Sequence, residues 1–280
     1  MADSENVIHN AKVISFINMK GGVGKTTLAI NIGYTMLEEY KKNVLLIDMD
    51  PQFNASQALM TKFRTIQEYS KLRDKNKTIA SVLTSSGNSL VSNDIDNHND
   101  NIIINLKENK GKRFDLVPGD LSLTSYESAS RGSEKLLAKY LNDLKKNKTY
   151  DYVIIDTPAT YSIYSQASLY ASNYYIVPIS PDIFSTLGYD LLQKALNNDL
   201  VLEGHDLKNL GIIFTMYNEN KQKRSNIINS FSNNITFTSK LYENENIRSG
   251  SIDNFLYDMQ GTKENIIDIT GELLRKLGDN

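Results

Sequence analysis

A glycine-rich loop constrains this chain more than any other feature. The loop spans residues 18–27, NMKGGVGKTT, and lies between an apolar run at 13–17 and a stretch of helical spacing that begins near Thr26. Its glycines allow a tight turn whose backbone N–H groups point at an anion, and the following helix adds the positive end of its dipole. Lys25 would reach the β- and γ-phosphates of a nucleotide, and the Thr26 hydroxyl would bind Mg2+. This strand–loop–helix context favours a nucleotide site over a glycine turn that only packs a strand on a helix.

The loop departs from the general pattern at two adjacent positions. The pattern places a glycine six residues before the lysine, but here Met19 stands there and is followed by a second lysine, Lys20. Since Lys25 already serves one triphosphate, Lys20 either joins the same phosphates or reaches the nucleotide of another subunit. A solvated Lys20 is the alternative interpretation.

Three aspartates follow apolar runs at the expected carboxyl ends of strands. Asp48 and Asp50 come after the run 44–47, and Asp156 comes directly after the run 152–155. An open α/β sheet binds its ligands at this edge. Because strand residues alternate between faces, we expect Asp48 and Asp50 to share one face, with one near the metal and the other near the attacking water. Two acids that cap a turn before Pro51 are the alternative. Asp156 has the form of a Walker B acid, which helps to hold Mg2+.

Apolar runs alternate with helical patterns along the chain. We expect strands at 13–17, 44–47, 102–104, 114–117, 152–155, 174–179 and 210–216, and helices at 26–41, 54–60, 79–83, 134–144, 167–171, 181–192 and 264–277. This order predicts an α/β fold, a mostly parallel doubly wound sheet with helices on both faces. We expect residues 1–280 to form a single domain. The polar, asparagine-rich stretch 62–112 predicts a surface elaboration with an exposed loop at 93–101.

Composition excludes several classes of protein. The chain has no cysteine, which rules out disulfides, thiolate metal sites and cysteine-ligated clusters. No apolar run approaches the about 18 residues of a membrane span, and residues 1–12 lack the apolar core of a secretory signal, so we expect a cytoplasmic protein. The net charge of −2 argues against a protein that binds DNA through the electrostatic field of its whole surface, but it is compatible with a local basic patch.

Charge is distributed unevenly toward the C-terminus. A basic stretch contains five cations against Glu243 and Glu245, namely Lys221, Lys223, Arg224, Lys240 and Arg248. Solvated charge on a helix explains this stretch equally well. The terminal helix at 264–277 balances its acids and bases, so packing on the sheet is favoured over a membrane-surface role.

Four segments together resemble the ParA-type partition ATPases. They are KGGVGKTT at 20–27, DMDPQFNAS at 48–56, the stretch 151–158 and TMYN at 215–218, and their order and spacing match that family over most of the chain. The similarity is to short members without an N-terminal helix-turn-helix domain, and it implies a P-loop NTPase with a deviant Walker A loop. One departure lies at 218–220, where Asn-Glu-Asn replaces the Asp-x-Arg of many relatives.

The resemblance also implies a mechanism and partners. Such a protein is a weak ATPase that uses ATP and Mg2+ and forms a face-to-face homodimer on ATP. The dimer binds double-stranded DNA without sequence preference and releases it after hydrolysis, which a small centromere-binding (ParB-like) protein stimulates. The expected location is the cytoplasm, in association with the nucleoid and away from membranes.

The same resemblance assigns roles to individual residues. Lys20 would cross to the partner's phosphates, and Asp50 would position the attacking water, so the catalytic residues are Lys20, Lys25 and Asp50. Thr26, Asp48 and Asp156 would support the metal. The nucleotide would contact Lys20, Gly21, Gly22, Val23, Gly24, Lys25, Thr26, Thr27, Met216 and Asn218. Arg248 is the strongest candidate for a DNA contact, ahead of Lys221, Lys223, Arg224 and Lys240.

Other functions remain open at this point. A membrane-associated positioning ATPase of the MinD type shares the loop but would need a cationic amphipathic tail. A nitrogenase-type reductase needs cluster cysteines, and a capsule-type tyrosine kinase needs a tyrosine cluster at its C-terminus, whereas the last tyrosine here is Tyr257. A scaffold that binds ATP without hydrolysis is a further alternative.

Overall fold

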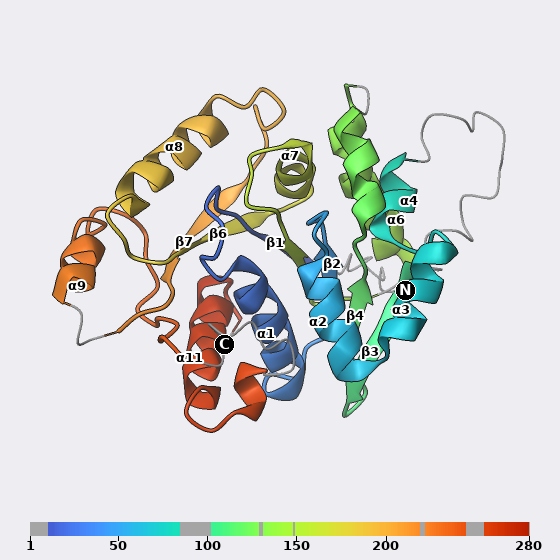
Figure 1. Cartoon of the computed structure of the whole chain (residues 1–280), viewed down its shortest axis with the longest axis horizontal. Helices are drawn as coiled ribbons and strands as arrows, with labels where there is room; N and C mark the ends of the chain where they lie inside the picture. The colour runs from blue at the N-terminus through green and yellow to red at the C-terminus, as the bar shows by residue number, and fades with distance from the viewer. Residues whose placement is uncertain are drawn as a thin grey trace, which may run out of the picture.

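A seven-stranded sheet organises the part of the chain that the structure describes (Figure 1). The computed structural model describes residues 11–84, 102–128, 131–147, 149–218, 222–244 and 255–279. The strand order is β3-β4-β2-β5-β1-β6-β7, and all neighbours are parallel except β3 and β4. This confirms the predicted α/β fold with a mostly parallel sheet. The strands are β1 (Lys12–Phe16), β2 (Val44–Asp48), β3 (Ile104–Asn109), β4 (Lys112–Val117), β5 (Tyr152–Asp156), β6 (Tyr174–Ile179) and β7 (Lys208–Phe214).

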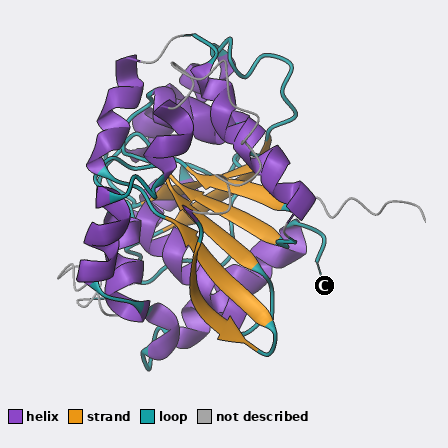
Figure 2. Ribbon diagram, turned by 90° about the vertical axis from the view of Figure 1, so that its right-hand side faces the viewer, coloured by secondary structure: helices purple, strands orange, loops and turns teal. Residues whose placement is uncertain are grey.

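Helices cover both faces of this sheet (Figure 2). The α-helices are α1 (Lys25–Glu38), α2 (Asn54–Phe63), α3 (Ile66–Asp74), α4 (Ile79–Thr84), α6 (Leu136–Asn147), α7 (Ile163–Tyr170), α8 (Ser185–Asn197), α9 (Gln222–Asn229) and α11 (Lys263–Lys276). The 3₁₀ helices are η3 (Leu121–Ser128), η4 (Ser133–Lys135) and η5 (Leu256–Asp258). Within the described residues, no helix is long and apolar enough to cross a membrane.

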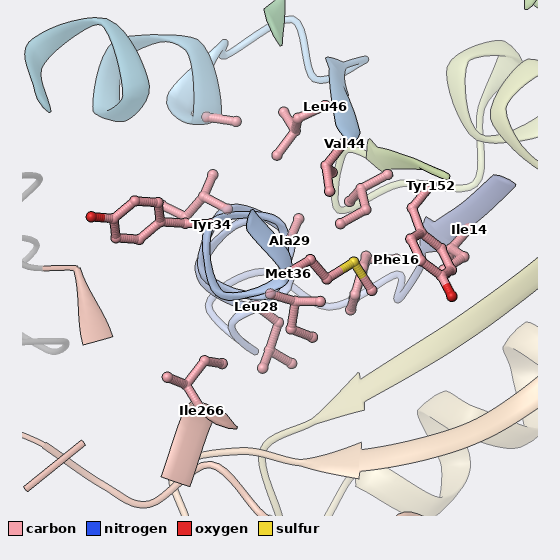
Figure 3. Packing of buried hydrophobic residues seen from close by; sticks show 14 of the residues in the cluster. Ile14, Phe16, Leu28, Ala29, Tyr34, Met36, Val44, Leu46, Tyr152 and Ile266 are labelled. Carbon is pink, nitrogen blue, oxygen red and sulfur yellow. The ribbon is translucent and has the colours of Figure 1, made fainter. Parts of the chain in front are cut away.

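Alternation along each central strand divides the core between the two faces. In β2, Val44 and Leu46 pack toward α1, whereas Leu45 and Ile47 join the core beneath α4 and α6. Figure 3 shows the first of these cores, with Leu28, Ala29, Tyr34 and Met36 of α1 beside residues of the sheet. Strands buried on both faces explain why the sequence shows continuous apolar runs there.

The terminal helix α11 packs against α1. Its Ile266, Ile269, Leu273 and Leu274 are buried in the same core as α1, and the two helices lie side by side in Figure 1. The apolar stripe of α11 is therefore covered by this protein's own core.

The stretch 62–112 is the region where the structure differs most from the prediction. It contains α3 and α4, and its strand β3 joins the sheet by pairing antiparallel with β4. The predicted strand at 102–104 is therefore wrong in position, because Ile102 packs into the core and the strand runs from Ile104 to Asn109. Lys110 and Gly111, both at positive φ, make the turn of this hairpin. The predicted loop at 93–101 lies outside the described residues.

Candidate nucleotide site

The phosphate loop connects the end of β1 to the start of α1 at the carboxyl edge of the sheet. Gly22 and Gly24 have φ values of 70° and 86°, which favour glycine. A Cβ atom at Gly24 would also lie 3.5 Å from the Thr215 side chain. Backbone groups at the start of α1, and the N–H groups of a loop in this conformation, form an anion site.

Hydrogen bonds to β6 and to the residue that follows β7 hold this loop in place. Asn18 donates from Nδ2 to the Pro178 carbonyl at 2.7 Å, and its Oδ1 accepts a hydrogen bond from the Lys20 N–H at 2.9 Å. Thr215, which follows β7, donates its hydroxyl to the Val23 carbonyl at 2.8 Å. The loop is thus shaped by contacts to β6 and β7 before any ligand binds.

The Lys25 ammonium lies within the loop. The residue is only 7% exposed, and Nζ donates to the Lys20 carbonyl at 3.2 Å. Burial lowers the pKa of Lys25, while the nearby charges of Asp156 and Asp50 oppose that shift. A buried ammonium with a single backbone acceptor is well suited to an incoming anion.

Asp48 and Asp156 lie opposite each other at the ends of β2 and β5. Both are fully buried, and they differ in their hydrogen bonds. Asp48 accepts from the Ser56 N–H at 2.8 Å, the Ser56 hydroxyl at 2.7 Å and the Asp50 N–H at 3.2 Å. Neither carboxylate oxygen of Asp156 has a hydrogen-bond partner among the described residues. Asp156 is therefore a buried acceptor without a hydrogen-bond partner among the described residues, and Thr26 and Lys25 of the loop lie near enough to affect its pKa.

Burial raises the pKa of both acids, and a neighbouring carboxylate adds to the shift, Asp48 for Asp156 and Asp50 for Asp48. For Asp156, burial has the largest effect and the Asp48 charge adds to it, while the nearby Thr26 hydroxyl and Lys25 ammonium act in the opposite direction. For Asp48, burial raises the pKa to about 7 against the hydrogen bonds from Ser56. A cation beside Asp156 would offset the cost of burying its charged form and lower its pKa.

The unpartnered Asp156 carboxylate and the adjacent Thr26 hydroxyl fit a Mg2+ ion, which prefers oxygen ligands. The described residues contain no group of three or more His, Cys, Asp or Glu that could hold a metal ion. A divalent ion here would thus need phosphate oxygens to complete its ligands. Asp48 already accepts three hydrogen bonds, so its oxygens are less available to a metal ion than those of Asp156.

Asp50 lies in the turn after β2, beyond the last strand residue, Asp48. Its Oδ1 accepts from the Gln52 N–H at 2.8 Å, and its carbonyl accepts from the Phe53 N–H at 2.8 Å. Asp50 therefore accepts two hydrogen bonds within the turn that follows β2. Among the described residues no hydrogen bond to its second carboxylate oxygen is found, and the charge of Asp50 acts on Lys25.

Lys20 is exposed at the rim of the loop and forms an ion pair with Asp182. Asp182 precedes α8, and its Oδ1 also accepts from the Phe184 N–H at 2.9 Å. Sequence reasoning missed Asp182 because 162 residues separate it from its partner. Asp182 stands three residues before α8, and an acid near the start of a helix predicts a local turn rather than a contact to the phosphate loop.

The turn after β7, residues 215–218, lies against the phosphate loop through Thr215. Two predicted DNA contacts point to this turn instead of solvent. Arg224 donates to the Met216 carbonyl, and the Lys240 ammonium lies 4.6 Å from the centre of the Tyr217 ring. Asn218 donates to Glu243 at 3.1 Å. Lys221 and Arg248 lie outside the described residues, and the Lys223 side chain is likewise not described.

This fold and site define a P-loop ATPase with a deviant Walker A loop. A family model described as "AAA domain" matches residues 11–203. The chain is 28% identical over 279 residues to a virulence plasmid ParA family protein of Chlamydia psittaci, covering 95% of each chain. It is 31% identical over 205 residues to the sporulation initiation inhibitor protein Soj of Bacillus subtilis, covering 69% of this chain and 70% of that protein.

A solved structure has the same fold. A plasmid partition protein from Borrelia burgdorferi B31, bound to AMPPNP, superimposes with a TM-score of 0.76 at 24% identity and covers 95% of this chain and 99% of its own. The chain belongs to the ParA-type partition ATPases, as the sequence motifs predicted.

Proposed function

We propose that this protein is an ATP-driven DNA partition protein that binds DNA as a nucleotide-dependent dimer. The observation that carries the proposal is the buried Asp156 carboxylate without a hydrogen-bond partner, next to Lys25 at the start of α1. This arrangement supports Mg2+-dependent ATP binding. The partition role is supported by the relatives, two of which are named ParA family protein and chromosome partitioning protein ParA.

In this proposal each residue of the site has one task during hydrolysis. The loop N–H groups and the Lys25 ammonium bind the β- and γ-phosphates and offset their charge. Thr26 and Asp156 hold Mg2+, which supplies countercharge to the phosphate oxygens when bound. The second oxygen of Asp50 positions the attacking water. Phosphoryl transfer depends mainly on such positioning and countercharge.

We further propose that Lys20 acts on the nucleotide of a second copy. Its exposed position at the rim of the loop supports this role. A cation supplied by a partner can raise the rate of phosphoryl transfer by about 10^3- to 10^5-fold. Lys20→Ala should therefore keep the fold and lose partner-stimulated hydrolysis, and normal stimulated turnover would exclude the assignment. Asp50→Ala should accumulate the ATP dimer, which gel filtration in ATP would detect.

Exposed apolar side chains beside Lys20 support an interface at the same edge. Ile183 and Phe184, which follow Asp182, are 81% and 64% exposed. Leu200 is 82% exposed but lies beyond the other end of α8, about 20 Å along the helix. Ile183→Ser should weaken the ATP dimer, and Leu200→Ser should leave it unchanged. Equal behaviour of the two variants would argue against an interface at this edge.

DNA binding is proposed for the basic residues that the structure leaves undescribed. Arg248, Lys221 and Lys223 are the candidates, because Arg224 and Lys240 are engaged with the turn after β7. A small centromere-binding protein is the proposed activator, and the proposed location is the nucleoid in the cytoplasm. The apolar face of α11 is covered by the core, so the membrane-surface alternative receives no support from that helix.

Binding to random-sequence duplex DNA tests the proposal. The measurement is made with ATP, ADP or no nucleotide, and the affinity is followed as salt is raised. We expect ATP-dependent binding that weakens as a power of the salt concentration, with a shallower slope for Arg248→Ala. Absence of DNA binding in every nucleotide state would overturn the partition role while leaving the ATP site intact.

A further inference from the structure

Met216 holds an unusual backbone conformation at the turn after β7. Its φ is 51°, in the left-handed region that non-glycine residues adopt rarely and at a cost in free energy. The preceding residue, Thr215, donates its hydroxyl to the Val23 carbonyl of the phosphate loop. A strained residue one position from this contact persists only when its surroundings hold it in place.

Arg224 of α9 supplies one of these restraints. Its guanidinium donates to the Met216 carbonyl and lies 3.4 Å from a carboxylate oxygen of Glu243. The Arg224 side chain is 22% exposed and that of Glu243 is 12% exposed, so this ion pair is largely shielded from water. A charge-assisted hydrogen bond is stronger than a neutral one, and shielding reduces its screening by salt.

Glu243 extends this restraint to the far side of the turn. The same oxygen that faces Arg224 accepts from the Asn218 side chain at 3.1 Å. The backbone of Tyr217 also accepts from the Glu243 N–H at 2.8 Å and donates to the Leu241 carbonyl at 3.0 Å. The turn is thus held between α9 and the segment 241–243, with one guanidinium and one carboxylate at its centre.

We infer that Arg224 is a positioning residue that fixes the turn 215–218 for the nucleoside part of ATP, and that it is not a DNA contact. The inference rests on the proposed nucleotide contacts of Met216 and Asn218. Arg224 acts on both ends of that pair, on Met216 directly and on Asn218 through Glu243. Within the described part of the chain, the hydrogen bonds of its guanidinium go to Met216 and Glu243 and not to the phosphate loop.

If the loop binds the phosphates and the turn binds the nucleoside, loss of Arg224 should affect the binding of some ligands and not of others. ATP contacts the loop and the turn, whereas inorganic tripolyphosphate contacts only the loop. Loss of Arg224 should therefore weaken ATP and spare tripolyphosphate. A residue that only stabilised the fold would not separate the two ligands.

Calorimetric titration of the full chain with ATP and with tripolyphosphate, both with Mg2+, tests this inference. Arg224→Gln should raise the Kd for ATP about tenfold, the range expected for one charge-assisted hydrogen bond, and change that for tripolyphosphate by less than about twofold. Arg224→Lys keeps a charge on the Met216 carbonyl and should recover part of the loss. Arg131→Gln, at an exposed arginine before η4, is the matched control and should change neither.

Several outcomes would overturn the inference. Equal weakening of both ligands by Arg224→Gln would place its effect on the loop or the fold. If Arg224→Gln leaves the affinity for ATP unchanged but makes DNA binding depend less steeply on salt concentration, Arg224 is a DNA contact. If Arg224→Gln unfolds the protein, Glu243→Gln replaces it, because it removes the ion pair with Arg224, and no selective loss of ATP in that variant refutes the role.

Two variants distinguish failure of this inference from failure of the proposed function. Asn218→Ala should weaken ATP selectively if the turn binds the nucleoside, so a selective loss there with no loss in Arg224→Gln would overturn only the role of Arg224. Lys25→Ala should weaken both ligands. Unchanged binding of both by Lys25→Ala would overturn the phosphate site itself and, with it, this inference.

Discussion

Replacing Asp156 by asparagine should stabilise the ligand-free protein while it abolishes Mg2+-dependent hydrolysis. Asp156 is fully buried, lies opposite Asp48, and neither of its oxygens has a hydrogen-bond partner among the described residues. Such a group is unfavourable in the folded protein until a cation binds. Asparagine has nearly the same shape and carries no charge, so Asp156→Asn removes the repulsion and keeps the packing.

The size of the effect follows from the unsatisfied carboxylate. Leaving a buried polar group unsatisfied costs about 1–3 kcal/mol, and more when the group is charged. The amide of asparagine also lacks partners, so part of this cost remains, and we expect a gain of about 2 kcal/mol in the free energy of unfolding. At about 3 °C per kcal/mol, the midpoint of thermal unfolding should rise by about 6 °C.

The gain should depend on pH in a definite direction. Burial and the Asp48 charge raise the pKa of Asp156 above its unfolded value. The unfolded chain therefore releases this proton first, and the penalty for folding with Asp156 grows as the pH rises above about 4. The stability difference between Asp156→Asn and the wild type should be largest near pH 8 and small near pH 4.

Thermal and urea unfolding without nucleotide or Mg2+, at pH 4.5 and pH 8, measure this difference. Asp206→Asn is the matched control, since its side chain is 85% exposed and its removal should change stability little. Addition of ATP with Mg2+ should stabilise the wild type and stabilise Asp156→Asn much less. A variant less stable than the wild type at pH 8 would refute the argument that Asp156 is an uncompensated buried acid.

Two further predictions concern the scaffold. Gly33→Ala should destabilise the protein by about 1–3 kcal/mol, because a Cβ there would lie 2.9 Å from the Phe114 ring in the core; urea unfolding that matches the wild type would contradict this packing. Asp279→Asn should lower the unfolding temperature at pH 7, and this difference from the wild type should shrink as the pH falls below about 4, toward the lowered pKa of Asp279. Burial alone would raise the pKa of Asp279, but hydrogen bonds from Lys12, Tyr152 and Lys42 lower it overall. Its contribution, about 1 kcal/mol for a partly exposed group, is therefore present above the unfolded pKa and lost as the pH falls; pH-independent loss in the variant would contradict it.

The phosphate loop and the acids could be predicted because their signals are local. Each signal is contained in a few consecutive residues: the glycines and the lysine within 18–27, and the four apolar residues before Asp156. The two segments follow or form the neighbouring parallel strands β1 and β5. The start of α1 was predicted to within one residue for the same reason. Such local patterns predict the site because the backbone conformation that they specify is the one that binds phosphate.

The rest of the site depends on contacts between distant residues. β3 is an edge strand with the sequence INLKEN, and such a polar segment lacks the apolar run by which the buried strands were found. Arg224 and Lys240 form part of a basic stretch in the sequence, but in the structure both contact the turn after β7, where Tyr217 pairs with Tyr242. Charge alone could not distinguish a residue that binds a backbone carbonyl from one that faces DNA.

The balance of charges around the loop gives a reason for nucleotide and metal to bind together. Asp48, Asp50 and Asp156 lie near one buried ammonium, that of Lys25, so ATP alone would add negative charge to an acidic site. A divalent ion alone would lack ligands, because the described residues provide no group of three that could hold it. Each ligand supplies what the other lacks, since the ion offsets the charge of Asp156 and the phosphates complete the ion's coordination. On the proposed assignment, the unpartnered carboxylate of Asp156 is thus the feature that makes binding of ATP depend on Mg2+.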